Sequence, residues 1–377
     1  MKRTLALVLA ALAFAPIACG NKKSPSTEGS GSSGSATAIP VEPPQRLSQL
    51  PQMTMEKLAP AEDAKRTEKI ALGHALFFDK RLSGGADRAC YSCHQNEDGN
   101  GGKDPIAIGS GDKKLTRHSP VIWNVGYWKN AFYWDGRAKT LEDNVKGAWA
   151  LANMNAAPGA DTPDKTIAAL DKKAAEIGAI AGYKKLFDAA YPGTPVKSEH
   201  VIGALSEYMR TMVCNDTAFD KYAAGDKKAL TEQQQRGLDV FLTPSLGNCA
   251  MCHVAPHFST AMAIDGGAYF NVGIGTQGVP EDKVDEGRMK VTKAPADWAA
   301  FKIPSLRNIT KSAPYFHDGS VAKLEDAVKL MASGGIANKN KFAQLDDRKL
   351  SAAQLADLIA FLGALDCPNK LDEPKLP

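Results

Sequence analysis

Two Cys-x-x-Cys-His strings, at residues 90–94 and 249–253, constrain the fold of this chain more than any other feature. Two thiols at this spacing can add to the two vinyl groups of one haem, and the adjoining histidine can then ligate the iron. A thioredoxin-like cysteine pair or half of a zinc site would not need a histidine directly after each second cysteine. The sequence therefore predicts two covalently bound haem c groups, held by Cys90, Cys93, His94, Cys249, Cys252 and His253.

The first residues indicate export. A basic start at residues 1–3 precedes an apolar run that ends at Ala18 and is too short to cross a bilayer, so residues 1–18 are predicted to be a signal peptide. Cys19 and the Gly- and Ser-rich stretch after it predict lipid attachment at Cys19 and a flexible tether over residues 19–50. Pro16 departs from the leucine that is usual at this position of lipoprotein signals. A soluble periplasmic protein, cleaved nearby, is therefore the alternative.

The rest of the sequence is predicted to be mainly α-helical. Apolar residues recur at helical spacing on two faces, Val201, Leu205, Met209 and Met212, and Leu355, Leu358, Leu362 and Leu365. Helix starts are marked by capping-box pairs, Thr231 with Gln234 and Ser351 with Gln354. No strand pattern is evident, and the Gly-rich stretches 99–102 and 273–278 are predicted to be loops. The net charge of +4 is spread among acids, which argues against a nucleic-acid partner.

A stretch after each haem string is repeated within the chain. Pro-Val-Ile-Trp-Asn-Val at 120–125 leads to Asp-Gly at 135–136 and Leu-Glu-Asp-Asn-Val at 141–145. Pro-Ser-Leu-Arg-Asn-Ile at 304–309 leads to Asp-Gly at 318–319 and Leu-Glu-Asp-Ala-Val at 324–328. The repeat predicts two cytochrome c units with one haem each, over residues 51–220 and 221–377, with a boundary near 216–229.

The two copies differ at one position that matters for iron. Met331 of the second copy corresponds to Ala148 of the first, and only the methionine can ligate iron. Histidine plus methionine saturates the iron and raises its potential, whereas a haem without a sixth ligand can bind a small oxidant. We therefore expect His253 and Met331 to hold an electron-storing haem and His94 to hold a reactive one. Met262 and Met289 compete with Met331 for that role.

From Leu72 to Leu365 the chain resembles the bacterial di-haem cytochrome c peroxidase family and its MauG-like relatives. The resemblance is carried by L-G-H-A-L-F-F-D at 72–79, F-Y-W-D-G-R-A at 132–138, P-S-L-R-N at 304–308 and A-P-Y-F-H-D-G at 313–319. It implies two cytochrome c-like domains, a peroxidatic haem on His94, an electron-transfer haem on His253 and Met331, and Trp134 between the haems. The MauG-like branch has tyrosine in place of Met331, which favours the peroxidase-like arrangement.

The sequence also departs from this family. Many members carry a second histidine in the loop after the first haem, and the matching position here is Ser110. The distal Gln, Pro and catalytic Glu of the family match Asn144, Ala148 and Asn153, so the usual acid–base carboxylate is missing or comes from elsewhere, Glu97, Glu142 and Asp143 being candidates. An asparagine that helps to hold an interdomain calcium in relatives matches His118, with Ser312 and Pro314 at other contact positions.

Two further expectations concern residues outside these motifs. Cys214 and Cys367, the cysteines left over in an oxidising compartment, are expected to form a disulfide, with two buried free thiols as the alternative. The remaining histidines are expected to be packing, capping or surface residues, namely His74, His118, His200, His257 and His317.

The function expected from the sequence is that of a periplasmic di-haem oxidoreductase. It would reduce hydrogen peroxide to water with electrons from a small cytochrome or cupredoxin, and Trp134, Asn144 and Asn153 are its candidate catalytic residues. The alternatives are MauG-like oxidation of a protein or organic substrate, and a non-catalytic di-haem electron carrier. The resemblance also implies a homodimer.

Overall fold

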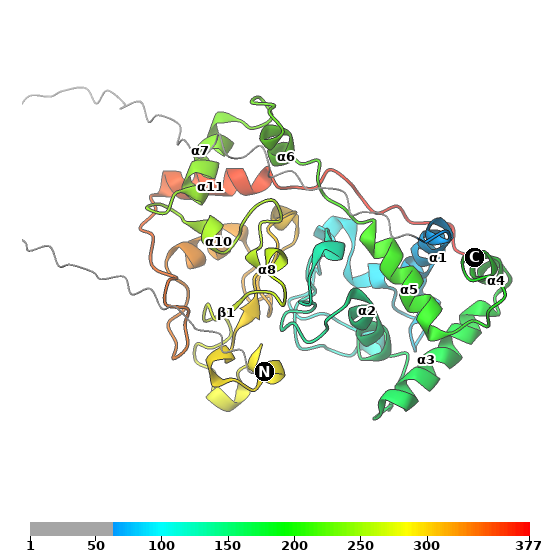
Figure 1. Cartoon of the computed structure of the whole chain (residues 1–377). Helices are drawn as coiled ribbons and strands as arrows, with labels where there is room; N and C mark the ends of the chain where they lie inside the picture. The colour runs from blue at the N-terminus through cyan, green and yellow to red at the C-terminus, as the bar shows by residue number, and fades with distance from the viewer. Residues whose placement is uncertain (1–62) are drawn as a thin grey trace, which may run out of the picture. The chain divides into compact units, whose positions relative to one another are not determined.

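The computed structural model describes residues 63–377, which belong to one compact unit (Figure 1). The signal peptide predicted at residues 1–18, the anchor at Cys19 and the tether at 19–50 lie outside the described residues. Within residues 63–377, none of the helices has the length and apolar character needed to span a bilayer.

The described part of the chain is mainly helical, as predicted. Its α-helices are α1 (Arg66–Phe78), α2 (Leu141–Ala150), α3 (Pro163–Gly178), α4 (Ala181–Ala190), α5 (Ser198–Arg210), α6 (Ala218–Ala223), α7 (Glu232–Leu242), α8 (Thr260–Ala263), α9 (Met289–Thr292), α10 (Leu324–Ala332) and α11 (Ala352–Gly363). Two short strands, β1 (Tyr269–Phe270) and β2 (Phe301–Lys302), pair antiparallel with Tyr269 opposite Lys302. Neither strand was predicted, because two residues are too few to show an alternating pattern.

Local signals in the sequence mark α5, α7 and α11 correctly. The predicted faces are largely buried on α5 and α11 and just after them, with Val201, Leu205 and Leu365 no more than 1% exposed and Leu355 half-buried. Both capping boxes form: the hydroxyl of Thr231 accepts the N–H of Gln234 at 3.2 Å, and the hydroxyl of Ser351 accepts that of Gln354 at 3.2 Å. Each cap satisfies backbone donors that the first helical turn leaves unpaired.

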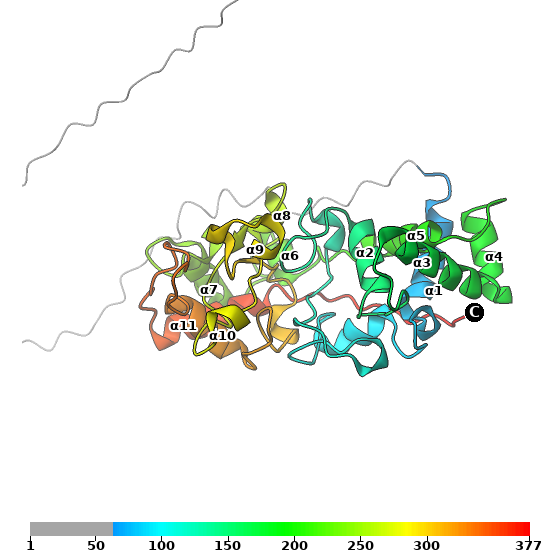
Figure 2. The same cartoon turned by 90° about the horizontal axis from the view of Figure 1, so that it is seen from below.

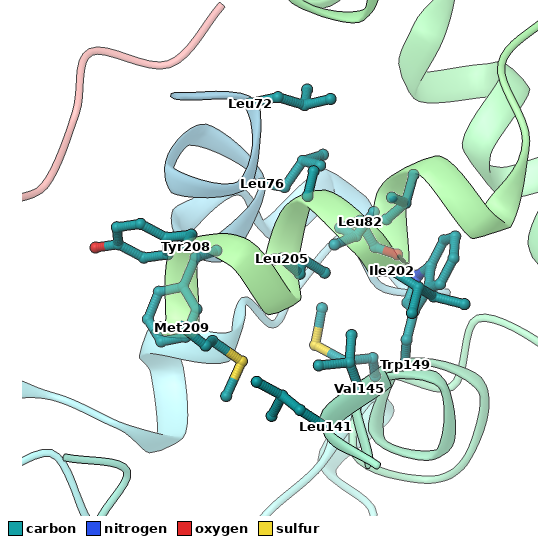
Figure 3. Packing of buried hydrophobic residues seen from close by; sticks show 14 of the residues in the cluster. Leu72, Leu76, Leu82, Leu141, Val145, Trp149, Ile202, Leu205, Tyr208 and Met209 are labelled. Atoms are coloured by element: carbon teal, nitrogen blue, oxygen red, sulfur yellow. Dashed lines mark hydrogen bonds between the residues drawn. The ribbon is translucent and has the colours of Figure 1, made fainter. Parts of the chain in front are cut away.

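Two hydrophobic clusters organise the fold. The first gathers side chains of α1, α2 and α5, among them Leu76, Trp149 and Leu205 (Figure 3). The second gathers side chains of α6, α7 and α11. The pairs α1–α5 and α7–α11 lie side by side in both views (Figures 1 and 2). The division into two domains at residue 220 stays a prediction. The two hydrophobic clusters are the structural feature most relevant to it.

The repeat seen in the sequence has the same backbone geometry in both copies. Asn124 and Asn308 both adopt the left-handed conformation, with φ of 63° and 65°. The N–H of Asn124 donates to the carbonyl of Met212 at 2.8 Å, and that of Asn308 to the carbonyl of Leu365 at 3.1 Å. An isolated antiparallel bridge follows in each copy, Phe132 with Ala138 and Tyr315 with Val321.

Cys214 and Cys367 form the predicted disulfide, with their Cα atoms 5.5 Å apart. The two cysteines occupy corresponding positions of the repeat, since the N–H of Cys214 donates to Oδ1 of Asn124 at 2.8 Å and that of Cys367 to Oδ1 of Asn308 at 2.9 Å. The disulfide therefore joins equivalent points of the two copies.

The residues after the disulfide return to the first cluster. Leu371 packs there, and its backbone exchanges two hydrogen bonds with the side chain of Asn96, at 2.8 and 2.9 Å. His74 bonds to the carbonyl of Asp372 at 2.6 Å. These residues fall within the predicted C-terminal domain, but they pack against the N-terminal half.

Candidate functional site

A cavity of about 470 Å³ opens beside the first Cys-x-x-Cys-His string. It brings together residues that are far apart in the sequence, from the first string to the second copy of the repeat. Six predicted site residues line it, namely Cys90, Cys93, His94, Trp134, Asn144 and Asn153.

Both motif histidines are held in the orientation that a haem ligand needs. Nδ1 of His94 lies 3.1 Å from the carbonyl oxygen of Asn100, and Nδ1 of His253 lies 3.0 Å from that of Phe258. A metal-bound histidine commonly donates its second ring N–H to a carbonyl, which fixes the tautomer and leaves Nε2 for the metal. The same arrangement at both strings fits one haem iron at each.

The protonation state of these histidines also suits ligation. Burial lowers the pKa of His94 to about 4, although hydrogen bonds to the carbonyls of Asn100 and Pro120 act in the opposite direction. Burial lowers the pKa of His253 to about 4 as well, against hydrogen bonds to Phe258 and Pro304. Pro120 and Pro304 open the two copies of the repeat. Both imidazoles are therefore neutral at pH 7, the form that binds a metal.

The cavity wall contains the residues that sequence comparison placed opposite the first haem. Asn144, Ala148 and Asn153 all line it, and Asn144 is fixed by its carbonyl, which accepts the hydroxyl of Tyr133 at 2.8 Å. None of the described residues lining the cavity is Asp or Glu. Glu97, Glu142 and Asp143 are not among them. Ser110 is buried outside the lining and donates its hydroxyl to Asp87 at 2.6 Å.

Other groups able to ligate iron also line the cavity. They include His118, Met154 and Met209, beside the phenols of Tyr133 and Tyr315. Both methionines are buried in the first hydrophobic cluster, and Nδ1 of His118 bonds to the carbonyl of Asp104 at 2.9 Å. Sequence reasoning identified none of the three as a ligand, because methionine in a core and histidine in a loop carry no spacing signal.

Trp134 lies where the two copies of the repeat meet. Its indole N–H donates to the carbonyl of His118 at 2.8 Å, and its ring centroid is 6.5 Å from that of His317. His317 occupies the position of the second copy that corresponds to Trp134 in the first, and it stacks on Phe301 at 3.5 Å. The N–H of Lys302 donates to the carbonyl of Trp134 at 2.8 Å. Trp134 is thus fixed by both halves.

His253 and Met331 are the predicted iron ligands of the second haem. Met331 lies in the last turn of α10 and is half-buried. Met262 is buried in α8, and Met289 packs near Trp298. The structure gives no contact of Met331 with His253 among the described residues, so the pair stays a prediction.

A family model described as di-haem cytochrome c peroxidase matches residues 67–228. The cytochrome c551 peroxidase of Pseudomonas aeruginosa is 34% identical to this chain over 313 residues, which cover 81% of each protein. The chain belongs to the di-haem cytochrome c peroxidase family. The methylamine utilization protein MauG of Methylorubrum extorquens is 31% identical over 371 residues, covering 97% of each. A solved MauG-like protein associated with microbial copper homeostasis has a TM-score of 0.73 and 29% identity, over 86% of this chain and 96% of that one.

Membership of the di-haem cytochrome c peroxidase family makes the chain a di-haem oxidoreductase with iron in two haem c groups. The observed geometry agrees, because each string presents two thiols and an oriented neutral histidine. Two of the other histidines lie as the sequence predicted: His200 forms a capping contact with Lys197, and His74 stacks on Tyr208.

The structure adds wall residues that the sequence did not reveal. Lys302, Pro304 and Ser305 line the first haem's cavity although they belong to the second half of the chain. Ser312 and Pro314 do so too. Calcium stays a prediction; among the described residues no group of three or more His, Cys, Asp or Glu is arranged to hold a metal ion. The internal repeat was the one sequence signal for these wall residues, because Pro304 corresponds to Pro120, which faces His94.

Proposed function

We propose that this protein reduces hydrogen peroxide to water at the His94 haem, with electrons that a small cytochrome or cupredoxin delivers to the His253 haem. The asymmetry of the repeat carries the proposal: Ala148 lines the first cavity, whereas the corresponding residue of the second copy is Met331. An alanine leaves the iron accessible and a methionine can close it. The peroxidases among the relatives support the same assignment.

The side chains have separate roles in this proposal. Cys90 and Cys93 hold the haem and His94 ligates it, and the bound haem supplies the electron transfer to peroxide. Asn144 and Asn153 offer amide hydrogen bonds to peroxide but cannot exchange its proton. The two protons consumed with two electrons per peroxide would then come from water. Trp134, held between the halves, is the proposed electron path.

A second candidate is peroxide-driven oxidation of a protein or organic substrate. It is favoured by the cavity wall, in which no carboxylate is present among the described lining residues, and by the alignment with MauG over 97% of both chains. Slow peroxide turnover would leave an oxidised di-haem state time to act on another substrate.

Steady-state peroxide consumption with a reduced small cytochrome or cupredoxin as donor tests the proposal. Rapid donor oxidation supports peroxide reduction. Little donor oxidation but peroxide-dependent oxidation of an added organic substrate would favour the second candidate. Inertness in both assays, with two clean redox transitions, would show an electron carrier instead.

The remaining expectations are part of the same proposal. The protein is exported to the periplasm or cell envelope, is attached by a lipid at Cys19, and forms a homodimer. Mass spectrometry of the mature N-terminus tests the anchor: a diacylated Cys19 supports it, and an unmodified terminus elsewhere contradicts it. Sedimentation of the purified di-haem protein tests the dimer.

A further inference from the structure

The wall of the first haem's cavity is strongly cationic. Five basic side chains line it, Arg88, Lys114, Arg117, Arg137 and Lys302. A haem carries two propionates, so this wall offers more positive charge than the haem needs. Which of these side chains is available to a propionate depends on the ion pairs that it already makes.

The three arginines are already paired with carboxylates. Arg88 bonds to Asp112 at 3.0 Å, and Arg137 bonds to Asp135 at 3.0 Å. Arg117 bridges Asp135 at 2.7 Å and Asp285 at 2.6 Å. Neither lysine forms an ion pair with a residue in 63–377, and Lys114 is exposed to water.

Lys302 differs from Lys114 because it is enclosed. It lies in β2 opposite Tyr269 and reaches into the first half of the chain. Its Nζ donates to the carbonyl of Ala131 at 2.7 Å and lies 3.5 Å from the ring centroid of Trp128. An ammonium has three donors, and the carbonyl uses one of them. The ammonium of Lys302 is therefore buried without a carboxylate partner among residues 63–377.

This environment lowers the pKa of Lys302. Burial lowers its pKa to about 7, and the charge of Asp135 acts in the opposite direction. Asp135 cannot compensate further, because its oxygens are bonded to Arg117 and Arg137. An enclosed ammonium is stabilised when an anion is brought next to it.

We propose that Lys302 is the counter-ion of a propionate of the His94 haem, so that β2 of the second half completes the haem site of the first half. The proposal rests on haem attachment at Cys90 and Cys93 and does not require peroxide turnover. A fixed positive charge at the propionate edge would raise the reduction potential of this haem, since reduction makes the haem more negative. It would not act equally on the His253 haem, which is attached elsewhere in the chain.

The test is the reduction potential of each haem in Lys302→Met, measured by spectroelectrochemistry on the di-haem protein. Lys302→Arg keeps the charge, and Lys185→Met removes an exposed lysine that does not line the cavity. At a fixed potential, Lys302→Met should lower the ratio of reduced to oxidised His94 haem at least about tenfold, a shift of about 59 mV for one electron. The His253 haem should change little, and Lys302→Arg and Lys185→Met should resemble the parent.

Two outcomes would overturn the proposal. One is an unchanged potential of the His94 haem in folded Lys302→Met. The other is an equal shift of both haems, which would indicate loosened packing between the halves. Should Lys302→Met fail to fold, Lys302→Gln provides the same comparison, because it keeps a donor for Ala131 and removes the charge. A failure of peroxide turnover with this potential shift intact would contradict only the proposed function.

Discussion

At the residue scale, we predict that Asn153 limits how fast the His94 haem can react with peroxide. It lines the cavity and its carbonyl accepts the N–H of Ser110 at 2.9 Å, so its backbone position is fixed. Asn153→Glu should raise the rate of reaction of the oxidised protein with peroxide about a hundred- to ten-thousand-fold, because a carboxylate can relay the proton between the oxygens. Stopped-flow absorption measures this rate. Asn153→Gln is the matched control, and equal rates in the two variants would show that the acid–base group is elsewhere.

Met331 is the second residue whose role can be tested alone. If it ligates the second iron, Met331→His should lower that haem's potential, since imidazole is a stronger donor to ferric iron than a thioether. The His94 haem should keep its potential. Met262→Leu is the control for a competing methionine. An unchanged spectrum and potential of the second haem in Met331→His would assign the ligand to another residue.

The haem-binding residues could be predicted one by one from the sequence, because the chemistry of attachment fixes their spacing. That Lys302 is available to a haem propionate could not be predicted from the sequence. Its position depends on the pairing of β2 with β1 and on contacts with Trp128 and Ala131, which are more than 170 residues away. Nothing in the local sequence of a lysine states which cavity it will line.

At the element scale, two helix pairs depend on a glycine at the point of closest approach. A Cβ on Gly73 of α1 would lie 1.9 Å from the carbonyl oxygen of Ala204 in α5. A Cβ on Gly237 of α7 would lie 1.9 Å from that of Asp357 in α11. Gly73→Ala and Gly237→Ala should each lower the free energy of unfolding by about 1–3 kcal/mol, because the helices must move apart. Guanidinium denaturation measures the change.

Gly363 provides the control for these substitutions. It ends α11, and no atom lies within 4 Å of the position that its Cβ would occupy. Gly363→Ala should leave stability unchanged or raise it by up to about 1 kcal/mol, as alanine is the better helix former. Equal effects at all three glycines would mean that close helix approach is not what the first two provide.

The disulfide between Cys214 and Cys367 should contribute stability by closing a long loop. The two residues are 153 positions apart, and disulfides typically contribute about 2–4 kcal/mol. The double variant Cys214→Ser/Cys367→Ser should therefore show a lower denaturation midpoint, while the backbone bonds to Asn124 and Asn308 are kept. A midpoint equal to that of the parent under oxidising conditions would contradict this.

Much at this scale was predictable. The faces of α5 and α11, both capping boxes and the repeat follow from spacing that can be counted along the chain, and the disulfide from the two cysteines left over in an oxidising compartment. The return of Leu371 and Asp372 to the first cluster was not predictable, because it depends on long-range contacts with Asn96 and His74 that have no local periodicity.

At the scale of the whole molecule, the two copies of the repeat are joined by contacts that reach the first cavity. His118 donates its N–H to the carbonyl of His317 at 2.7 Å, and Arg288 donates to the carbonyl of Asp135 at 2.8 Å. Arg117 links Asp135 and Asp285 across the same boundary. A change in one half can therefore alter the haem site in the other half, as the proposed role of Lys302 requires.

We predict that the His94 haem has an accessible iron in the fully oxidised protein, whereas the His253 haem does not. Optical and electron paramagnetic resonance spectra of the oxidised protein, recorded with and without cyanide, test it most directly. We predict a high-spin haem that becomes low-spin on cyanide binding, beside a second haem that does not respond. Two low-spin haems that both ignore cyanide would contradict the account and would point to His118, Met154 or Met209 as a sixth ligand in the first cavity.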